Sequence, residues 1–188
     1  STGMGGPSTA IAVEELVKTG VEVFIRLGTC GGMAMQVKPG DLVIAQGAIR
    51  REGMSHEYAP AGYPAIADHR LTEALRVEAE RLGYRHHVGV VHCKDSFYGQ
   101  HAPETMPVAK QLEEEWQAWI AAGALASEME SAALYITAST RRVRAACILN
   151  VIWNQERAKA GIEEEDYKSM DRAITTVVEM IRHGGHLL

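Results

Sequence analysis

The chain has 188 residues, of which 46% are hydrophobic and 23% are charged, a balance typical of a globular protein with a substantial core. Its formal net charge of −5 argues against a broad basic surface, so neither nucleic acid nor an anionic membrane is expected as a partner. The three cysteines are far apart and form no CxxC pair. This usage argues against a disulfide framework or a zinc site and predicts reduced thiols in a cytoplasmic protein.

The hydrophobic pattern alternates between strand and helix signals along the chain. Runs rich in branched residues predict strands at 21–27, 42–49, 86–93 and 143–153. Amphipathic runs predict helices at 7–19, 68–82, 131–140 and 163–182, with a shorter one inside 103–123. Loops are expected at 50–64, 94–100 and 154–161. Strands that alternate with helices at this spacing indicate an α/β protein with a mostly parallel or mixed sheet.

The first residues, Ser1 to Gly6, already form a glycine-rich loop with no strand before it. A domain rarely begins this way, so we expect that an N-terminal segment is missing from this numbering. The sequence shows no repeat, no low-complexity tract and no linker. Residues 1–188 are therefore predicted to be a single domain that lacks its N-terminal part.

The stretch from Val21 to Gly32 combines a predicted strand with an arginine, a threonine and several glycines. In open α/β sheets, ligands bind beyond the carboxyl ends of the strands, where glycines allow the backbone to come close. The guanidinium of Arg26 presents a fork of donors suited to phosphate, and Thr29 adds a hydroxyl. The alternative interpretation is an ordinary glycine turn with Arg26 in a structural ion pair.

A second candidate is the segment Glu128-Met129-Glu130, which precedes a predicted helix. Carboxylates at a helix N-terminus are often only partners of the helix dipole. An ionised carboxylate accepts hydrogen bonds without donating any, so it also suits the hydroxyls of a sugar, with the methionine covering the apolar face. Both interpretations remain open from these residues alone.

Five segments together resemble the uridine phosphorylases of the nucleoside phosphorylase family. They are Ser1–Ser8, Ile11–Leu16, Arg26–Thr29, Phe97–Gln100 and Glu128–Ala132. The resemblance spans nearly the whole chain and implies a nucleoside phosphorylase fold, with a central mixed and twisted β-sheet flanked by helices. It also implies reversible phosphorolysis, in which phosphate attacks C1′ of uridine to give uracil and ribose 1-phosphate, a reaction of pyrimidine nucleoside salvage and catabolism.

The resemblance assigns roles to individual positions. It implies that Arg26 and Thr29 bind phosphate, that Thr29, Met129 and Glu130 hold the ribose, and that Phe97, Gln100 and Glu128 face the base. Arg26, Thr29 and Glu130 would be the catalytic set. These roles suit a transition state that resembles an oxocarbenium ion, because a carboxylate on the sugar hydroxyls and an anion below C1′ both favour it.

The family resemblance also carries expectations about cofactors and assembly. Phosphate is the co-substrate and no organic cofactor is expected. A monovalent cation is implied at a dimer interface near Met4 and Ser8. The family usually forms hexamers built from three dimers that share active sites, so a homo-oligomer of this kind is expected.

The choice of base rests on two further positions. Purine-cleaving relatives place an aspartate after the late core strand to protonate the leaving base, and this chain has Asn154 there. Gln100 offers a donor and an acceptor that match a uracil edge. The chain also departs from the uridine phosphorylase pattern, since Ala102 and Gln155 stand where arginines are common, with His101 and Arg157 nearby.

Two rival classes of function remain open from the sequence. The first is a purine nucleoside phosphorylase, or a nucleosidase that uses water in place of phosphate. The second is a non-catalytic protein that binds a nucleoside or mediates assembly without turnover. The identity of the released base and its dependence on phosphate separate these alternatives.

Overall fold

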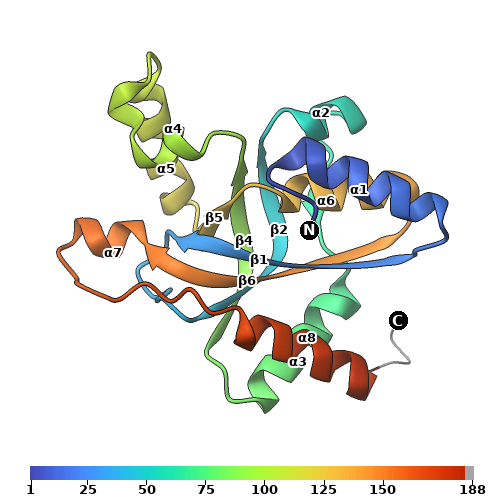
Figure 1. Ribbon diagram of the computed structural model, residues 1–188. Coiled ribbons are helices and arrows are strands. Elements are labelled where there is room, and N and C mark those ends of the chain that lie inside the picture. The colour runs from blue at the N-terminus through green and yellow to red at the C-terminus, as the bar shows by residue number, and fades with distance from the viewer. Residues whose placement is uncertain (185–188) are drawn as a thin grey trace.

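A computed structural model describes residues 1–184 of the chain as an α/β structure (Figure 1). The strands are β1 (Val23–Gly32), β2 (Leu42–Arg51), β3 (Ala65–Ile66), β4 (His86–Lys94), β5 (Ala126–Glu128) and β6 (Arg144–Asn154). The helices are α1 (Gly6–Lys18), α2 (Met54–Tyr58), α3 (His69–Arg81), α4 (Phe97–His101), α5 (Ala109–Ala121), α6 (Ser131–Arg141), α7 (Gln155–Lys159) and α8 (Asp171–Gly184), with a 3-10 turn at Pro103–Thr105.

The strands form one mixed sheet in the order β3-β2-β4-β5-β1-β6, and β2 also pairs with β6. This extra pairing closes β2, β4, β5, β1 and β6 into a barrel. The long pairs β1–β6 and β2–β4 are parallel, whereas β2–β6 and β1–β5 are antiparallel. The expectation of a central mixed sheet flanked by helices is therefore confirmed.

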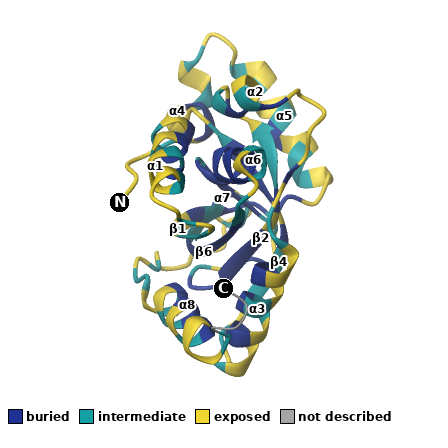
Figure 2. Cartoon of the chain, turned by 90° about the vertical axis from the view of Figure 1, so that its right-hand side faces the viewer, coloured by how far each residue is buried: buried dark blue, intermediate teal, exposed yellow. Residues whose placement is uncertain are grey.

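Helices cover the sheet in two groups. Helices α1, α2 and α6 lie together on one side, and α3 and α8 lie together on the other (Figure 1). Helix α6 is buried along most of its length (Figure 2), because Ala-rich turns let it pack closely between α1 and the strands. Within residues 1–184, every helix is too short or too polar to cross a lipid bilayer.

The predicted boundaries hold for most elements, but β1 is longer than the sequence pattern indicates. The glycines expected to form a loop at 28–32 continue the strand and pair with β6 and β5. These positions need glycine because neighbouring side chains pack closely against the strand, and not because the chain turns there. A Cβ at Gly28 would lie 2.7 Å from the guanidinium of Arg26, and one at Gly32 would lie 2.5 Å from the amide of Asn154. Arg26 and Thr29 therefore lie within a strand.

The predicted C-terminal helix begins at Asp171 and not at 163. Residues before it are held against β6 by two hydrogen bonds. The backbone amide of Tyr167 donates to the carbonyl of Ile152 (2.9 Å), and the side-chain amide of Asn150 donates to the backbone carbonyl of Tyr167 (2.9 Å). These tertiary bonds replace the helical bonds that local propensity favours.

Three segments expected to be loops contain the short helices α2, α4 and α7. Ser96 caps α4 by accepting the Gly99 amide (2.9 Å). Asn154 caps α7 by accepting the amides of Glu156 (2.9 Å) and Arg157 (3.0 Å). Each of the three helices is too short for hydrophobic periodicity, so the sequence signals α4 and α7 only by their caps, and α2 has no side-chain cap.

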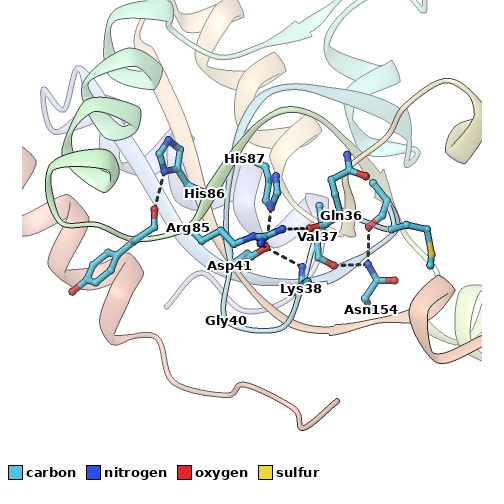
Figure 3. Close-up of polar contacts among 12 residues, drawn as sticks. Gln36, Val37, Lys38, Gly40, Asp41, Arg85, His86, His87 and Asn154 are labelled. Carbon is cyan, nitrogen blue, oxygen red and sulfur yellow. Dashed lines mark hydrogen bonds and ion pairs between the residues drawn. The ribbon is translucent and has the colours of Figure 1, made fainter. Parts of the chain in front are cut away.

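An ionic cluster around Asp41 anchors the start of β2, as Figure 3 shows. One carboxylate oxygen, Oδ2, lies 3.0 Å from Nε of Arg85 and 2.8 Å from Nε2 of His87, and it accepts the Lys38 amide at 3.0 Å. Burial raises the pKa of Asp41, but these three partners outweigh it and the pKa lies below its ordinary value. The cluster fixes the turn that leads into the core strand.

Candidate active site

A cavity of about 600 Å³ lies at the carboxyl ends of β1, β4, β5 and β6. The predicted substrate residues that line it are Arg26, Thr29, Phe97, Gln100, Glu128, Met129 and Glu130. They come from separate parts of the chain, and the barrel brings all seven to one place. The volume falls in the range of pockets that hold small molecules.

Arg26 forms the ionic centre of this cavity. Its Nη1 lies 3.3 Å from Oε2 of Glu128, and its Nη2 donates to Oε2 of Glu130. Burial opposes the charge, but Cys147 and the two carboxylates outweigh it, so the pKa of Arg26 lies above its ordinary value. Arg26 thus makes the ion pairs of the alternative interpretation, and it makes them with residues that themselves line the cavity.

Glu130 also joins the N-terminal glycine loop to the site. Its Oε1 accepts the backbone amide of Gly5 at 2.7 Å, while Oε2 binds Arg26. Gly5 has a φ of 86°, in the left-handed region that glycine tolerates best. The carboxylate of Glu130 is therefore held in place from two sides.

Glu128 is fully buried and organises the start of α6. Its carboxylate accepts the backbone amides of Glu130 (2.9 Å) and Ser131 (2.9 Å), in addition to its contact with Arg26. An acidic side chain at this helix end is favoured by the exposed amides and the helix dipole. The same bonds fix the backbone that presents Met129 and Glu130.

An aromatic wall closes one side of the cavity. The ring centroid of Phe97 lies 4.3 Å from that of His101, which lies 5.8 Å from that of Trp153. Burial, with a smaller contribution from Lys94, lowers the pKa of His101, so its ring is neutral at neutral pH. His101 occupies the wall beside Ala102, one of the positions where the chain departs from the family pattern.

Another part of the cavity lining is polar. Gln100 is buried, accepts from the hydroxyl of Ser127 (2.9 Å) and donates to Oε1 of Gln155 (2.9 Å). Lys94 donates to the same Ser127 hydroxyl at 2.9 Å. Lys94 and Ser127 line the cavity but were not among the predicted site residues.

Lys94 is a partly buried cation whose hydrogen-bond partner is a hydroxyl, and residues 1–184 give it no ion-pair partner. Burial is the main cause of a lowered pKa at Lys94, although Glu128 opposes it. A partly desolvated cation that faces a cavity interacts strongly with negative charge there. The signal that could have revealed it is a lysine directly after a predicted strand, where β4 ends.

The comparisons with known proteins agree with this geometry. A family model described as the phosphorylase superfamily matches residues 1–183. The chain belongs to this superfamily. It is 53% identical over 182 residues to a uridine phosphorylase of Treponema pallidum, covering 97% of this chain and 70% of that protein. It is 36% identical over 185 residues to a uridine phosphorylase of Escherichia coli, covering 97% and 73%.

The superfamily includes proteins named for other bases. The chain is 36% identical over 182 residues to a guanosine phosphorylase of Halorubrum lacusprofundi, covering 97% of this chain and 71% of that protein. Membership of the superfamily therefore does not identify the base, which must be inferred from the residues that line the cavity.

Two residues that were considered for base recognition lie elsewhere in this phosphorylase. The amide of Asn154 donates to the carbonyls of Ala34 (2.9 Å) and Val37 (2.8 Å) while its oxygen caps α7 (Figure 3). Arg157 pairs with Glu164 at 2.7 Å. Neither lines the cavity, because Asn154 is committed to the backbone and Arg157 points to the surface loop.

The remaining candidates are Met4 and Ser8, near which a monovalent cation is expected. The hydroxyl of Ser8 donates to the carbonyl of Met4 at 2.8 Å, on an exposed face at the start of α1. Both oxygens suit a monovalent cation, but they are only two of the several ligands that such an ion needs. Cys30 is buried and burial raises its pKa, so it is a packing thiol and not a nucleophile.

Proposed function

We propose that the protein catalyses the reversible phosphorolysis of uridine to uracil and ribose 1-phosphate. The observation that carries this proposal is that Arg26, Glu130 and Gln100 line one cavity. They are suited to phosphate, to sugar hydroxyls and to the edge of a base, respectively. The high identity to relatives named uridine phosphorylase supports the same activity. The proposal extends to a cytoplasmic enzyme of nucleoside metabolism.

In the proposed mechanism, Arg26 and Thr29 hold phosphate below the sugar. A phosphate oxygen forms the new bond to C1′ while the bond from C1′ to N1 of the base breaks, and its electron pair leaves with the base. Glu130 accepts hydrogen bonds from the ribose hydroxyls, with Met129 against the sugar. The carboxylate then stabilises the positive charge that develops near C1′.

Charge on the leaving base is met from the polar side of the cavity. The positive charge that develops at C1′ and the negative charge on the base are stabilised by different residues. Glu130 faces the sugar, while Lys94 and Gln100 face the base. The ammonium of Lys94 stabilises the uracil anion, and its burial strengthens that interaction. Phe97 packs against the ring, and Glu128 borders base and sugar.

The preference for a pyrimidine rests on the same side of the cavity. A purine leaving group needs an acid, and the position that supplies it in purine-cleaving relatives is Asn154, which is bound to backbone atoms. The specific rival is a purine nucleoside phosphorylase, since one relative is named a guanosine phosphorylase.

The proposal includes a homo-oligomer, with a hexamer of three dimers as the expected state and a monovalent cation near Met4 and Ser8. The cavity lining holds two basic residues, Arg26 and Lys94, against the two carboxylates Glu128 and Glu130. An incoming phosphate dianion needs more positive charge than this balance offers. Cations from a second copy of the chain would meet that need at a shared site.

The test is release of uracil from uridine and of hypoxanthine from inosine, each with and without phosphate. We expect phosphate-dependent release of uracil, preferred over hypoxanthine by about two decades or more, since a missing general acid alone typically costs about 10²–10⁴-fold. Equal cleavage of inosine would replace the proposal with the purine rival. Release without phosphate would indicate a nucleosidase, and binding of uridine without turnover a non-catalytic protein.

A further inference from the structure

Four side chains form one continuous row of hydrogen bonds along the polar side of the cavity. Lys94 donates to Ser127 (2.9 Å), Ser127 donates to Gln100 (2.9 Å), and Gln100 donates to Gln155 (2.9 Å). The Nδ1 atom of His92 lies 3.2 Å from the same Ser127 hydroxyl. The row connects β4, β5, α4 and α7, which are distant in sequence.

The donor order of this row begins at Lys94. An ammonium group only donates, so the oxygen of Ser127 must accept from Lys94. The hydroxyl of Ser127 donates to Oε1 of Gln100, and in the tautomer that completes this order His92 presents Nδ1–H to the remaining lone pair. Gln100 consequently has Oε1 toward Ser127 and Nε2 toward Gln155.

The aromatic surroundings hold His92 in the orientation that this requires. Its ring stacks on Trp119, with centroids 6.4 Å apart, and meets Trp116 edge to face at 6.0 Å. Burial lowers the pKa of His92 to about 4, so the ring is neutral at neutral pH and its one N–H can serve Ser127.

Most side chains of the row expose little surface to water. Exposed fractions are 3% for Ser127, 7% for Gln100, 7% for His92 and 8% for Gln155. A second cavity of about 200 Å³ is lined by His92 and Gln155 and shares Lys94 and Gln100 with the first. Since water has little access to these groups, a reversed amide would leave polar atoms without partners.

An amide held in one orientation can pair with only one order of donor and acceptor on the base. After its two internal bonds, Gln100 has one lone pair on Oε1 and one N–H on Nε2. In that order they match the N3–H and a neighbouring carbonyl of uracil. Cytosine presents an acceptor at N3 and an amino group beside it, which would need the amide turned by 180°.

We infer that Ser127, held by Lys94 and His92, is a specificity-determining residue that fixes the orientation of Gln100 and so selects uracil over cytosine. This inference rests on the proposed function. Ser127 acts through Gln100 and is a positioning residue. Its removal therefore changes the ratio between two bases, whereas a general structural defect lowers both activities together.

The test compares Ser127→Ala with the unmutated protein and with Ser127→Thr, which retains the hydroxyl. The measurement is kcat/KM for phosphorolysis of uridine and of cytidine. We expect the uridine-to-cytidine ratio to fall by about ten- to hundredfold in Ser127→Ala, since a site built to hydrogen-bond discriminates strongly only while its polar groups stay in register. Ser127→Thr should restore most of the ratio.

An unchanged ratio in folded Ser127→Ala would overturn the inference. If that variant does not fold, Ser127→Cys is measured in its place, because a thiol is close in size to the hydroxyl but is only a weak donor. An unchanged uridine-to-cytidine ratio in Ser127→Cys would overturn the inference equally. Failure of the proposed function is seen separately, in the unmutated protein. Without uridine turnover there, uracil and cytosine binding to both proteins by calorimetry gives the ratio instead.

Discussion

The two sides of the cavity are built on different principles. On the sugar and phosphate side, Arg26 lies between Glu128 and Glu130, and charge holds the geometry. On the base side, Ser127, Gln100 and Gln155 are neutral, and the direction of hydrogen bonds holds the geometry. Lys94 adds a positive charge at the end of that neutral row. The first arrangement suits an anion and a developing cation, and the second suits a neutral ring.

This difference has consequences for substitution. On the sugar and phosphate side, a substitution that changes the shape of a side chain but keeps its charge should be tolerated better than one that removes the charge. The reason is that the Coulomb interaction acts over several ångströms. A hydrogen-bonded side is sensitive to any change in donor order, because each buried polar atom depends on one partner. Variants on the two sides should therefore differ in which kinetic constant they change.

The largest effect is expected at Lys94. Replacing it with methionine removes both the charge near the leaving base and the first donor of the row, so kcat should fall by about 10²–10³-fold, as for loss of one transition-state donor. The control is Lys159→Met, since Lys159 is half exposed and pairs with Glu156. A Lys94→Met enzyme with normal kcat would remove Lys94 from the mechanism.

The pH dependence of kcat gives a second test of the role of Lys94. Because burial lowers the pKa of Lys94, the ammonium loses its proton at lower pH than a free lysine, and kcat should decline on the alkaline side. Lys94→Arg keeps a cation at all accessible pH values. Its alkaline decline should move upward, which a pH–rate profile of both proteins measures.

A smaller effect is expected at Glu130. Glu130→Gln keeps the shape but replaces the carboxylate, so its bonds to the ribose hydroxyls no longer strengthen as C1′ becomes positive. We expect kcat to fall by about tenfold to hundredfold, from the typical 1.5–3 kcal/mol of a charged hydrogen bond, with a smaller rise in KM for uridine. Near-normal turnover would leave Glu130 as a partner of Arg26 alone.

At Arg26 the expected change is in KM and not in kcat. Alanine would leave two buried carboxylates without a partner, so lysine is the better test because it keeps the charge and loses the planar fork. Arg26→Lys should raise KM for phosphate by about tenfold and KM for uridine far less. An equal rise in both constants, with a lower melting temperature, would favour a structural ion pair.

The smallest effect on activity is expected at Asp41, which lies outside the cavity. Asp41→Asn should cost about 1–3 kcal/mol of unfolding free energy, because Arg85, His87 and the Lys38 amide lose a charged acceptor. Since the pKa of Asp41 is lowered on folding, its contribution is full above the unfolded value and is lost as pH falls through the folded one.

Urea unfolding at neutral pH and at acid pH measures this loss. The difference between the unmutated protein and Asp41→Asn should shrink below about pH 4, the ordinary range of an aspartate, while kcat stays within twofold. Glu73→Gln, an exposed pair with Arg76 on α3, is the control and should change neither quantity measurably. A large loss of kcat in Asp41→Asn would contradict the separation of the cluster from the cavity.

The sequence by itself determined the α/β class, most of the helix and strand positions, and the substrate residues proposed for the cavity. Residues 42–49, 86–93 and 143–153 carry long runs of branched side chains, and such local patterns fix a strand wherever it lies. Arg26, Thr29 and Glu130 were found because their segments resemble a known family. In both cases the information is local.

The tertiary structure decided the features that depend on distant partners. The glycines after Arg26 continue a strand because β6 pairs with them, and the last helix begins late because Tyr167 is bound to β6. The row on the base side joins residues that are 33, 27 and 55 positions apart. A lysine, a serine and two glutamines have no pattern of their own in a sequence. Their chemistry arises only when the barrel closes and removes water, so that each donor must find one particular acceptor.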